Sequence, residues 1–355
     1  MKLLYGVQGT GNGHITRARA MQAALAVKGI EVDWVFSGRE RSKFFDMEAF
    51  GDFKVFKGLT FATKSGKIDL LKTFAEASLG QMYQDIRTLD LSQYDLAVTD
   101  FEPVVAWAAK KQGLPCIGIG HQYAFDHDIP KAAHSFASDA IMKWFAPVSL
   151  GVGVHWHHFN QPILPPIIEA DHPTDVVRVN RTLVYLPFEH SASVLKTLQS
   201  VDHAFVFHCA DIEPGRYSNV VVKGFSRDGF KDSLHATDGV ICNAGFELAS
   251  EALSLGRRLM VKPLKGQMEQ SSNALALSQL GLGLSTRSID TASLQRFLAQ
   301  AVVCQVNYPD VPELLARWLM TFPEQSLDEL VKVAWQGVEL PQVASPHDRQ
   351  PALTA

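Results

Sequence analysis

Short apolar runs alternate with longer stretches of mixed polarity along most of this chain. The runs are rich in Val, Ile and Leu, which is typical of strands buried on both faces of a parallel sheet. The longer stretches have the spacing of helices with one buried face. In the first half this pattern predicts strands at residues 2–7, 31–36, 53–56, 96–99 and 116–120, and helices at 15–28, 68–89 and 104–112.

The second half repeats the alternation. Strands are predicted at residues 181–185, 204–207, 220–223, 239–242 and 259–262, and helices at 193–198, 230–236, 246–255, 271–280, 291–302 and 311–322. Strands that alternate with helices form β-α-β units with parallel strands. The pattern therefore predicts an α/β protein built from two doubly wound, Rossmann-like domains.

A proline-rich connector at residues 161–166, with the sequence Gln-Pro-Ile-Leu-Pro-Pro, separates the two halves. Such a segment is stiff and continues neither a helix nor a central strand. We therefore predict a first domain at residues 1–162 and a second at 163–340. The tail at 341–355 mixes Pro, Gln, His and Asp without periodicity, and we expect it to be loosely ordered.

The composition excludes several classes of protein. Apolar residues make up 46% of the chain and charged residues 20%, which indicates a globular protein. A net charge of −4 gives no reason to expect a nucleic acid partner. The chain opens on an apolar strand rather than a secretory signal, and no apolar run is long enough to span a bilayer. The four cysteines are widely spaced, so we expect reduced core residues and a cytoplasmic protein.

A polar turn follows the apolar run at residues 239–242. Asn243, Ala244 and Gly245 form this turn, and a helix is predicted directly after it. The first backbone N–H groups of a helix have no partner within the helix, and together with the helix dipole they favour a phosphate. Glu251, one turn into the helix, is placed to accept hydrogen bonds from ribose hydroxyls, whereas Glu247 suits an ordinary first helical turn. We predict that a nucleoside diphosphate binds here.

This segment resembles family 28 of the GT-B glycosyltransferases, two-domain enzymes that use nucleotide sugars. The best-known member of that family adds N-acetylglucosamine to the lipid-linked peptidoglycan precursor. The residues that carry the resemblance are Ala244, Gly245, Ser250, Glu251, Ala252, Leu253, Gly256, Pro263, Gln270, Asn273 and Ala274. The chain departs from the family pattern at Arg258, where a proline is usual.

The resemblance implies two domains that face each other across a cleft, with the donor bound by the second domain. It also implies a UDP-sugar as the donor, inversion at the anomeric carbon, and no requirement for a metal or cofactor. Phe225 matches the position that lies against the nucleotide base, although it is equally typical of a core residue. Gln267 and Gln270 flank a loop whose carboxamides are suited to sugar hydroxyls.

A glycine-rich loop follows the first strand. Its residues Gly11, Asn12 and Gly13 do not complete a dinucleotide-binding fingerprint, because His14 stands where the third glycine belongs. The loop resembles the family 28 sequence Gly-Gly-Thr-Gly-Gly-His, which faces the donor phosphates and the acceptor. His14 is the predicted general base, since imidazole suits proton removal near neutral pH. The alternative is a histidine that only steadies the loop.

Two carboxylates and a second histidine follow neighbouring strands. Asp100 ends the strand at 96–99, where it is placed to hold the His14 tautomer, to bind the acceptor, or to cap the next helix. Glu102 is an alternative carboxylate in the same loop. His121 follows the strand at 116–120 and resembles a cleft residue of family 28. Glu102 and His121 are the predicted acceptor contacts.

Three weaker signals do not change this interpretation. Asp126 and Asp128 spell a D-x-D sequence, which we interpret as a solvated loop. His155 and His157 have the spacing of a strand face, but no carboxylate or cysteine completes a metal site. Arg17 and Arg19 are most simply interpreted as a solvated helix face. No metal site is predicted.

The sequence thus predicts a cytoplasmic glycosyltransferase that moves a sugar from a nucleoside diphosphate donor to an acceptor hydroxyl. The acceptor is left open among glycans, lipids and small molecules, as is peripheral contact with the inner face of the membrane. Two other functions stay open: a nucleotide-sugar 2-epimerase with the same fold, and a sensor that binds a nucleotide sugar without catalysis.

Overall fold

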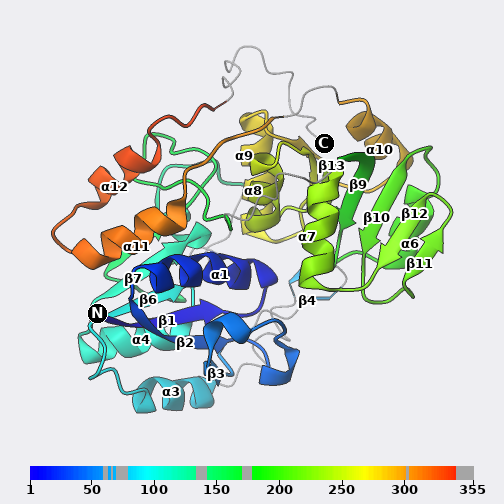
Figure 1. Cartoon of the computed structure of the whole chain (residues 1–355). Helices are drawn as coiled ribbons and strands as arrows, with labels where there is room; N and C mark the ends of the chain where they lie inside the picture. Colours follow the sequence, from blue (N-terminus) through cyan, green and yellow to red (C-terminus); the bar gives the residue numbers. More distant parts are fainter. Residues whose placement is uncertain are drawn as a thin grey trace.

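Two parallel sheets, each covered by helices, dominate the computed structural model of the chain (Figure 1). The structure describes residues 1–58, 63–64, 67–68, 79–132, 142–169, 178–300 and 304–340. Both sheets have helices on their two faces, as is typical of sheets that are wholly or mainly parallel. The α/β prediction of two Rossmann-like units is confirmed.

The first sheet has six parallel strands in the order β3-β2-β1-β6-β7-β8. The strands are β1 (Lys2–Gln8), β2 (Glu31–Ser37), β3 (Lys54–Phe56), β6 (Leu96–Asp100), β7 (Cys116–Gly120) and β8 (Leu150–Gly153). The helices of this half are α1 (Asn12–Val27), α3 (Leu79–Thr88) and α4 (Pro103–Gln112), with 3-10 turns η1 (Arg41–Lys43), η2 (Glu48–Phe50) and η3 (His121–Asp126). A separate two-stranded ladder joins β4 (Thr63–Lys64) and β5 (Lys67–Ile68).

The strand order of the first sheet places a ligand site at one point. The chain moves outward from β1 to β2 and β3 and then returns to the other side of β1 as β6. In open α/β sheets, ligands bind at the carboxyl ends of the strands where the order reverses in this way. Val7 of β1 pairs with Asp100 of β6 at that end, so residues that follow β1 and β6 meet there.

The second sheet has seven strands in the order β11-β12-β10-β9-β13-β14-β15, and only the β11–β12 pair is antiparallel. Its strands are β9 (Val179–Tyr185), β10 (Ala204–His208), β11 (Gly215–Tyr217), β12 (Val220–Lys223), β13 (Thr237–Asn243), β14 (Arg258–Lys262) and β15 (Leu284–Ser285). The helices are α6 (Ser191–Leu198), α7 (Arg227–Ala236), α8 (Phe246–Ser254), α9 (Met268–Gln279), α10 (Thr291–Leu298), α11 (Val311–Thr321) and α12 (Leu327–Ala334). Here the order reverses between β9 and β13.

The two halves share a buried interface. His121 of the first half stacks on Phe246 of α8 with ring centroids 4.0 Å apart, and its Nε2 lies 2.7 Å from Asn273 Oδ1 of α9. The indole N–H of Trp156 donates to Ser250 Oγ at 2.8 Å. Trp156 and Phe246 belong to one continuous apolar core that contains residues of β1 and α1 as well as of α8 and α9. The interface between the halves is therefore closely packed, and α1 lies in contact with α8.

The last two helices return to the first half. α11 packs against α1, and Lys28, the residue after α1, forms an ion pair of 2.8 Å with Glu313 of α11. α12 packs on α11, and the indole N–H of Trp335, just after α12, donates to the Ile163 carbonyl at 2.6 Å. Figure 1 shows α11 and α12 on the same side of the molecule as α1. The domain limits at residues 162 and 340 stay a prediction.

Some sequence-based expectations fail in their details. The helix predicted at 68–89 is wrong at its start, because Ile68 lies in β5 and the described helix begins at Leu79. The helix predicted at 291–302 ends at Leu298, and residues 301–303 are outside the described part. The predicted tail at 341–355 also lies outside the described residues. Within the described ranges, no helix is long and apolar enough to cross a membrane.

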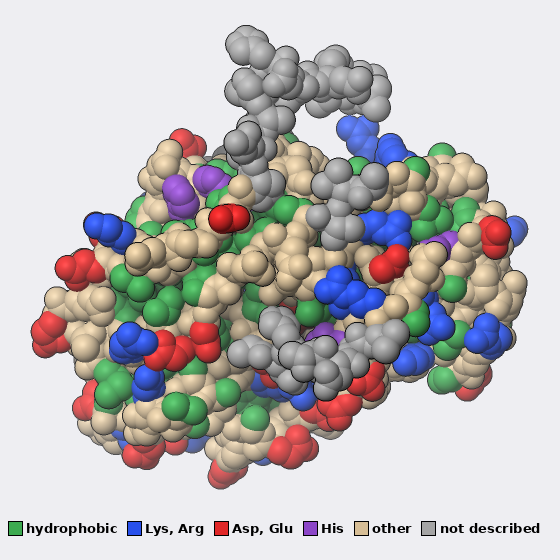
Figure 2. Space-filling model, turned by 45° about the horizontal axis from the view of Figure 1, so that its top comes forward, with side chains coloured by type: hydrophobic (Ala, Val, Ile, Leu, Met, Phe, Trp, Pro, Cys, Tyr) green, Lys and Arg blue, Asp and Glu red, His purple; other side chains and the backbone are tan. Residues whose placement is uncertain are grey.

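Figure 2 shows one face of the molecule, on which acidic and basic side chains are both present and apolar side chains lie between them. The cysteines are free, and only Cys304 is not fully buried. Burial raises the pKa of the Cys242 thiol to about 12, which keeps it protonated and unreactive.

Candidate active site

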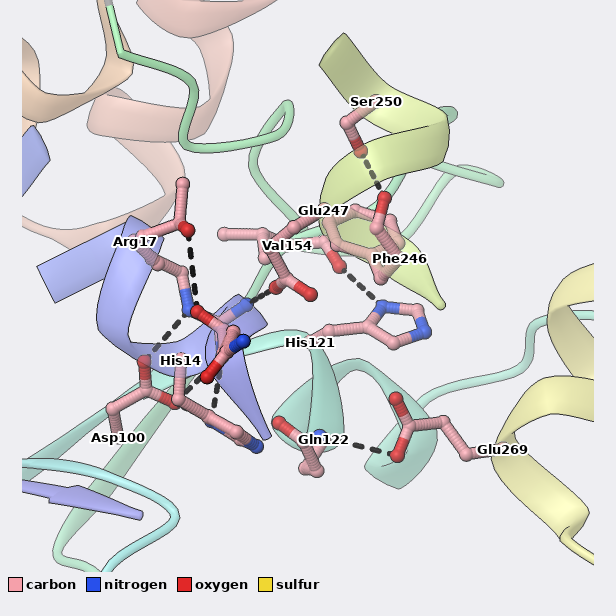
Figure 3. A network of polar contacts seen from close by, with 12 residues as sticks. His14, Arg17, Asp100, His121, Gln122, Val154, Phe246, Glu247, Ser250 and Glu269 are labelled. Atoms are coloured by element: carbon pink, nitrogen blue, oxygen red, sulfur yellow. Dashed lines mark hydrogen bonds and ion pairs between the residues drawn. The ribbon is translucent and has the colours of Figure 1, made fainter. Parts of the chain in front are cut away.

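His14 and Asp100 lie together at the carboxyl ends of β1 and β6 (Figure 3). The His14 Nδ1 atom is 2.8 Å from Asp100 Oδ1, and the histidine side chain keeps 16% of its surface exposed. Asp100 is fully buried as the last residue of β6. Holding the His14 tautomer is one of the roles that the sequence left open for Asp100, and the structure brings the two side chains within hydrogen-bond distance.

Arg17 completes this cluster, and the sequence interpretation of it was wrong. Its side chain is 1% exposed rather than part of a solvated face. Arg17 Nε and Nη2 donate to Asp100 Oδ2 and Oδ1 at 2.8 and 2.6 Å. Burial alone would raise the pKa of Asp100, but the charge of Arg17 and the contact with His14 outweigh it and lower that pKa. Asp100 is therefore held as a carboxylate.

The starts of α1 and α8 face each other beside this cluster. Glu247 in the first turn of α8 forms an ion pair with the Nη1 atom of Arg17. A Cβ atom on Gly13 would overlap the Glu247 carboxylate, so a larger residue there would displace that side chain. The N-caps of both helices are glycines, Gly11 and Gly245, and neither helix start is capped by a side chain. No atom lies within 4 Å of the position that a Cβ atom would take on either glycine, and the first N–H groups of a helix have no partner within the helix.

Gly245 has an ordinary backbone conformation, with φ −70° and ψ 149°. The conformation itself does not demand glycine, since any residue adopts it. What glycine provides here is the absence of a side chain between the helix start and the open space.

A pocket lies beside the first turns of α1. It is bounded by α1, by the end of β9, and by the starts of α7 and α8. Its lining residues are Asn12, Gly13, Ile15, Thr16, Arg19, Phe45, Glu169, Tyr185, Phe225, Ser226, Arg227, Phe230, Lys231, Glu247, Leu248 and Glu251. Four predicted donor residues, Asn12, Gly13, Phe225 and Glu251, thus line one pocket. His14 and Asp100 are not among the residues that line the pocket.

Glu251, which lines the pocket, has a raised pKa. Burial and the negative charge of Glu169 together raise the pKa of Glu251 to about 7. The positive charges of Lys231 and Arg227 act in the opposite direction. Glu169 is itself paired with Arg227 and with Lys231, at 2.6 Å in each case. Perturbed carboxyl groups inside a pocket are typical of binding sites.

Aromatic rings form one wall of the pocket. Phe225 is 50% exposed and packs edge-on against Tyr185, with ring centroids 5.9 Å apart. An exposed phenylalanine at the rim of a pocket is available to a planar ligand, whereas a core residue is not.

The other predicted donor residues differ in their availability. Gln270 is buried, and its Oε1 accepts from the Leu264 backbone N–H at 3.0 Å, so it shapes the loop. Gln267 is the N-cap position of α9 and is partly exposed. The Asn243 side-chain amide donates to the Lys262 carbonyl at 3.0 Å. The Ala244 carbonyl accepts from Asn273 Nδ2 at 3.0 Å.

The two predicted acceptor contacts are enclosed by protein. Glu102 is fully buried and caps α4, since its carboxylate accepts from the backbone N–H groups of Val104 and Val105 at 2.9 and 2.7 Å. His121 is also fully buried, with Nδ1 2.9 Å from the Val154 carbonyl oxygen. Both side chains are hydrogen-bonded within the protein, and neither is assigned a contact with the acceptor in the function proposed below.

Several residues of this region were not predicted from the sequence. Arg17, Glu169 and Tyr185 come from three distant segments, and no local motif connects them. The one available signal was the i, i+3 spacing of His14 and Arg17, which places both side chains on one face of a helix. In the described part of the chain, no group of three or more His, Cys, Asp or Glu side chains is arranged to hold a metal ion.

The sequence profile of glycosyl transferase family 1 matches residues 1–302. The chain belongs to this family. No curated protein matches the chain. The family assignment and the fold agree that the protein is a glycosyltransferase of GT-B type.

Solved glycosyltransferases share the fold of this family 1 member. The glycosyltransferase SsfS6 of Streptomyces sp. SF2575, complexed with thymidine diphosphate, is 14% identical, with a TM-score of 0.62 over 90% of this chain and 99% of its own. Glycosyltransferase VinC in complex with dTDP is 17% identical, with a TM-score of 0.53 over 95% and 100%. The spinosyn rhamnosyltransferase SpnG, complexed with spinosyn aglycone, is 13% identical, with a TM-score of 0.55 over 94% and 97%.

Proposed function

We propose that the protein transfers a sugar from a nucleoside diphosphate sugar to an acceptor hydroxyl, with inversion and without a metal. The observation that carries the proposal is the contact of 2.8 Å between His14 Nδ1 and Asp100 Oδ1, beside two uncapped helix starts. A histidine held through one ring nitrogen by a carboxylate presents the other nitrogen as a base.

The donor is proposed to bind across the pocket and the helix starts. Its nucleoside occupies the pocket, with the base against Phe225 and the ribose hydroxyls on Glu251. Its diphosphate lies at the N-terminal ends of α1 and α8, next to Gly11, Gly13 and Gly245, where the backbone N–H groups stabilise the departing anion. Residues 163–340 are proposed to bind this donor and residues 1–162 the acceptor.

In the proposed reaction, His14 Nε2 accepts the proton of the acceptor hydroxyl while the oxygen attacks the anomeric carbon. The bond from that carbon to the diphosphate oxygen breaks, and the diphosphate leaves with the electron pair. Asp100 stabilises the imidazolium that forms. The resemblance to family 28 supports UDP as the nucleotide, while SsfS6 and VinC are complexed with thymidine diphosphates, so dTDP belongs in the same test.

We expect one nucleoside diphosphate to stabilise the protein in a thermal-shift titration against UDP, dTDP, GDP, ADP and CMP, with and without magnesium. At about 100 times its dissociation constant, a ligand adds roughly 2.7 kcal/mol to the free energy of unfolding. Stabilisation that is equal with and without magnesium supports the proposed site, and no response to any nucleotide contradicts it. Incubation with UDP-N-acetylglucosamine alone then separates transfer, which needs an acceptor, from epimerisation.

Nucleotide affinity should rise with pH through about 7, because the pKa of Glu251 is about 7 and the carboxylate form is the better acceptor for ribose hydroxyls. Isothermal titration with UDP between pH 6 and 8 measures this slope. Glu251→Gln keeps the shape and removes the titration, so it serves as the matched control for the ionisation of UDP itself. Equal slopes in the two proteins would remove Glu251 from the nucleotide site.

A further inference from the structure

Arg17 contacts three side chains that come from three separate elements (Figure 3). Its Nε and Nη2 hold both oxygens of Asp100 at the end of β6. Its Nη1 is paired with Glu247 of α8, in the other half of the molecule. Its Nη2 is also 3.1 Å from His14 Nδ1 on its own helix. A fully buried guanidinium with these contacts has one orientation, because the planar fork fixes all its N–H directions together.

The same His14 nitrogen therefore has two neighbours of opposite character. Asp100 Oδ1, at 2.8 Å, can only accept a hydrogen bond, so contact with it requires a proton on Nδ1. Arg17 Nη2, at 3.1 Å, can only donate, so a hydrogen bond from it requires a bare Nδ1. The first state leaves Nε2 free to act as a base, and the second places the proton on Nε2 and prevents it.

The orientation of Arg17 decides between these two states. While Glu247 holds Nη1, the Nε and Nη2 edge of Arg17 is turned onto Asp100, which keeps Asp100 Oδ1 beside the ring. Nη2 already lies 3.1 Å from Nδ1, so loss of the Glu247 contact removes a restraint that keeps this donor on Asp100 rather than on the ring. Glu247 also lines the pocket and belongs to the first turn of α8, whose start is the proposed diphosphate site.

We propose that Arg17 is a positioning residue that links the seating of α8, through Glu247, to the tautomer of His14. The inference rests on the proposed function, because it gives the tautomer its catalytic meaning. In this proposal, the ion pair between Arg17 and Glu247 keeps His14 in its basic tautomer only while α8 is in position.

The test follows the His14 ring directly and needs no acceptor. The full-length protein is labelled with nitrogen-15 histidine, and two-bond proton–nitrogen correlations distinguish the Nδ1–H from the Nε2–H form of each neutral ring. The His14 signal is assigned by its loss in His14→Gln. We expect the Nδ1–H form in the wild type, and its loss in favour of the Nε2–H form in Glu247→Gln.

Glu313→Gln is the matched control. It makes the same substitution in a different ion pair, in which Glu313 of α11 contacts Lys28 at the end of α1. We expect it to leave the His14 signal unchanged. Glu247→Gln is the deciding variant, since Glu247 is 18% exposed and glutamine has nearly the same shape.

An unchanged His14 signal in Glu247→Gln, or an equal change in Glu313→Gln, would overturn the proposal. Either result would leave the glycosyltransferase reaction itself untouched, because the ring signal is read without turnover. Conversely, the loss of the general-base role would be seen in the turnover of His14 variants and not in this experiment.

Discussion

His14→Ala is expected to lower turnover by about 10²- to 10⁴-fold, the usual contribution of a positioned general base. The donor dissociation constant should stay nearly the same, because His14 is outside the residues that line the pocket proposed for the nucleoside. Both quantities are measured on the same preparation, turnover by the release of nucleoside diphosphate with an acceptor found by screening, and donor affinity by calorimetry with UDP.

His158→Ala is the control for this experiment. His158 packs against Trp335, and the substitution removes the same ring away from β1 and β6. We expect turnover close to that of the wild type. If His14→Ala also keeps wild-type turnover, His14 is not the base. If it weakens donor binding as strongly as turnover, His14 is a donor contact.

Asp100→Ala is expected to lower the free energy of unfolding by about 3–5 kcal/mol, the usual cost of breaking a buried ion pair. The loss is large because Arg17 stays fully buried and loses the two hydrogen bonds that it donates to the carboxylate. Chemical denaturation at neutral pH measures this difference.

Asp52→Ala provides the reference, since Asp52 is exposed and a surface substitution changes stability by only about 0.5 kcal/mol or less. The pH dependence gives a second check. The pKa of Asp100 is lowered in the folded protein, so its contribution is present above the unfolded value of about 3.9 and is lost as the pH falls through the folded pKa. The wild type and Asp100→Ala should therefore approach each other in stability under acid conditions. A constant difference between them would mean that the carboxylate charge is not what stabilises the native state.

Local sequence was sufficient for most of the fold. The runs at 116–120 and 239–242 are short, apolar and buried on both faces, so each produced an unambiguous strand. The last helix, α12, was missed although Ser326 and Glu329 form a capping box, because the apolar stretch that follows is short. β15 contains only two residues and has no periodicity of its own. Its strand conformation depends on pairing with β14.

The candidate site was predictable only where chemistry follows a strand end. His14 and Asp100 were found because the carboxyl ends of adjacent parallel strands meet at one edge of a sheet. Arg17 was missed because its partners are 83 and 230 positions away in the chain, and the sequence around it looks like an exposed helix face. Glu102 was misjudged for the opposite reason, since a carboxylate before Pro103 serves equally well as a helix cap.

The return of α11 to α1 has a consequence for any attempt to divide the protein. A fragment that ends near residue 162 would contain the whole first sheet but would lack the helix that covers α1. Leu315, Trp318 and Leu319 of α11 are fully buried in the intact chain. Without α11, the apolar surface that they cover would be open to water. We therefore expect the amino-terminal fragment to aggregate when produced alone and to become soluble when it is co-expressed with the remainder of the chain.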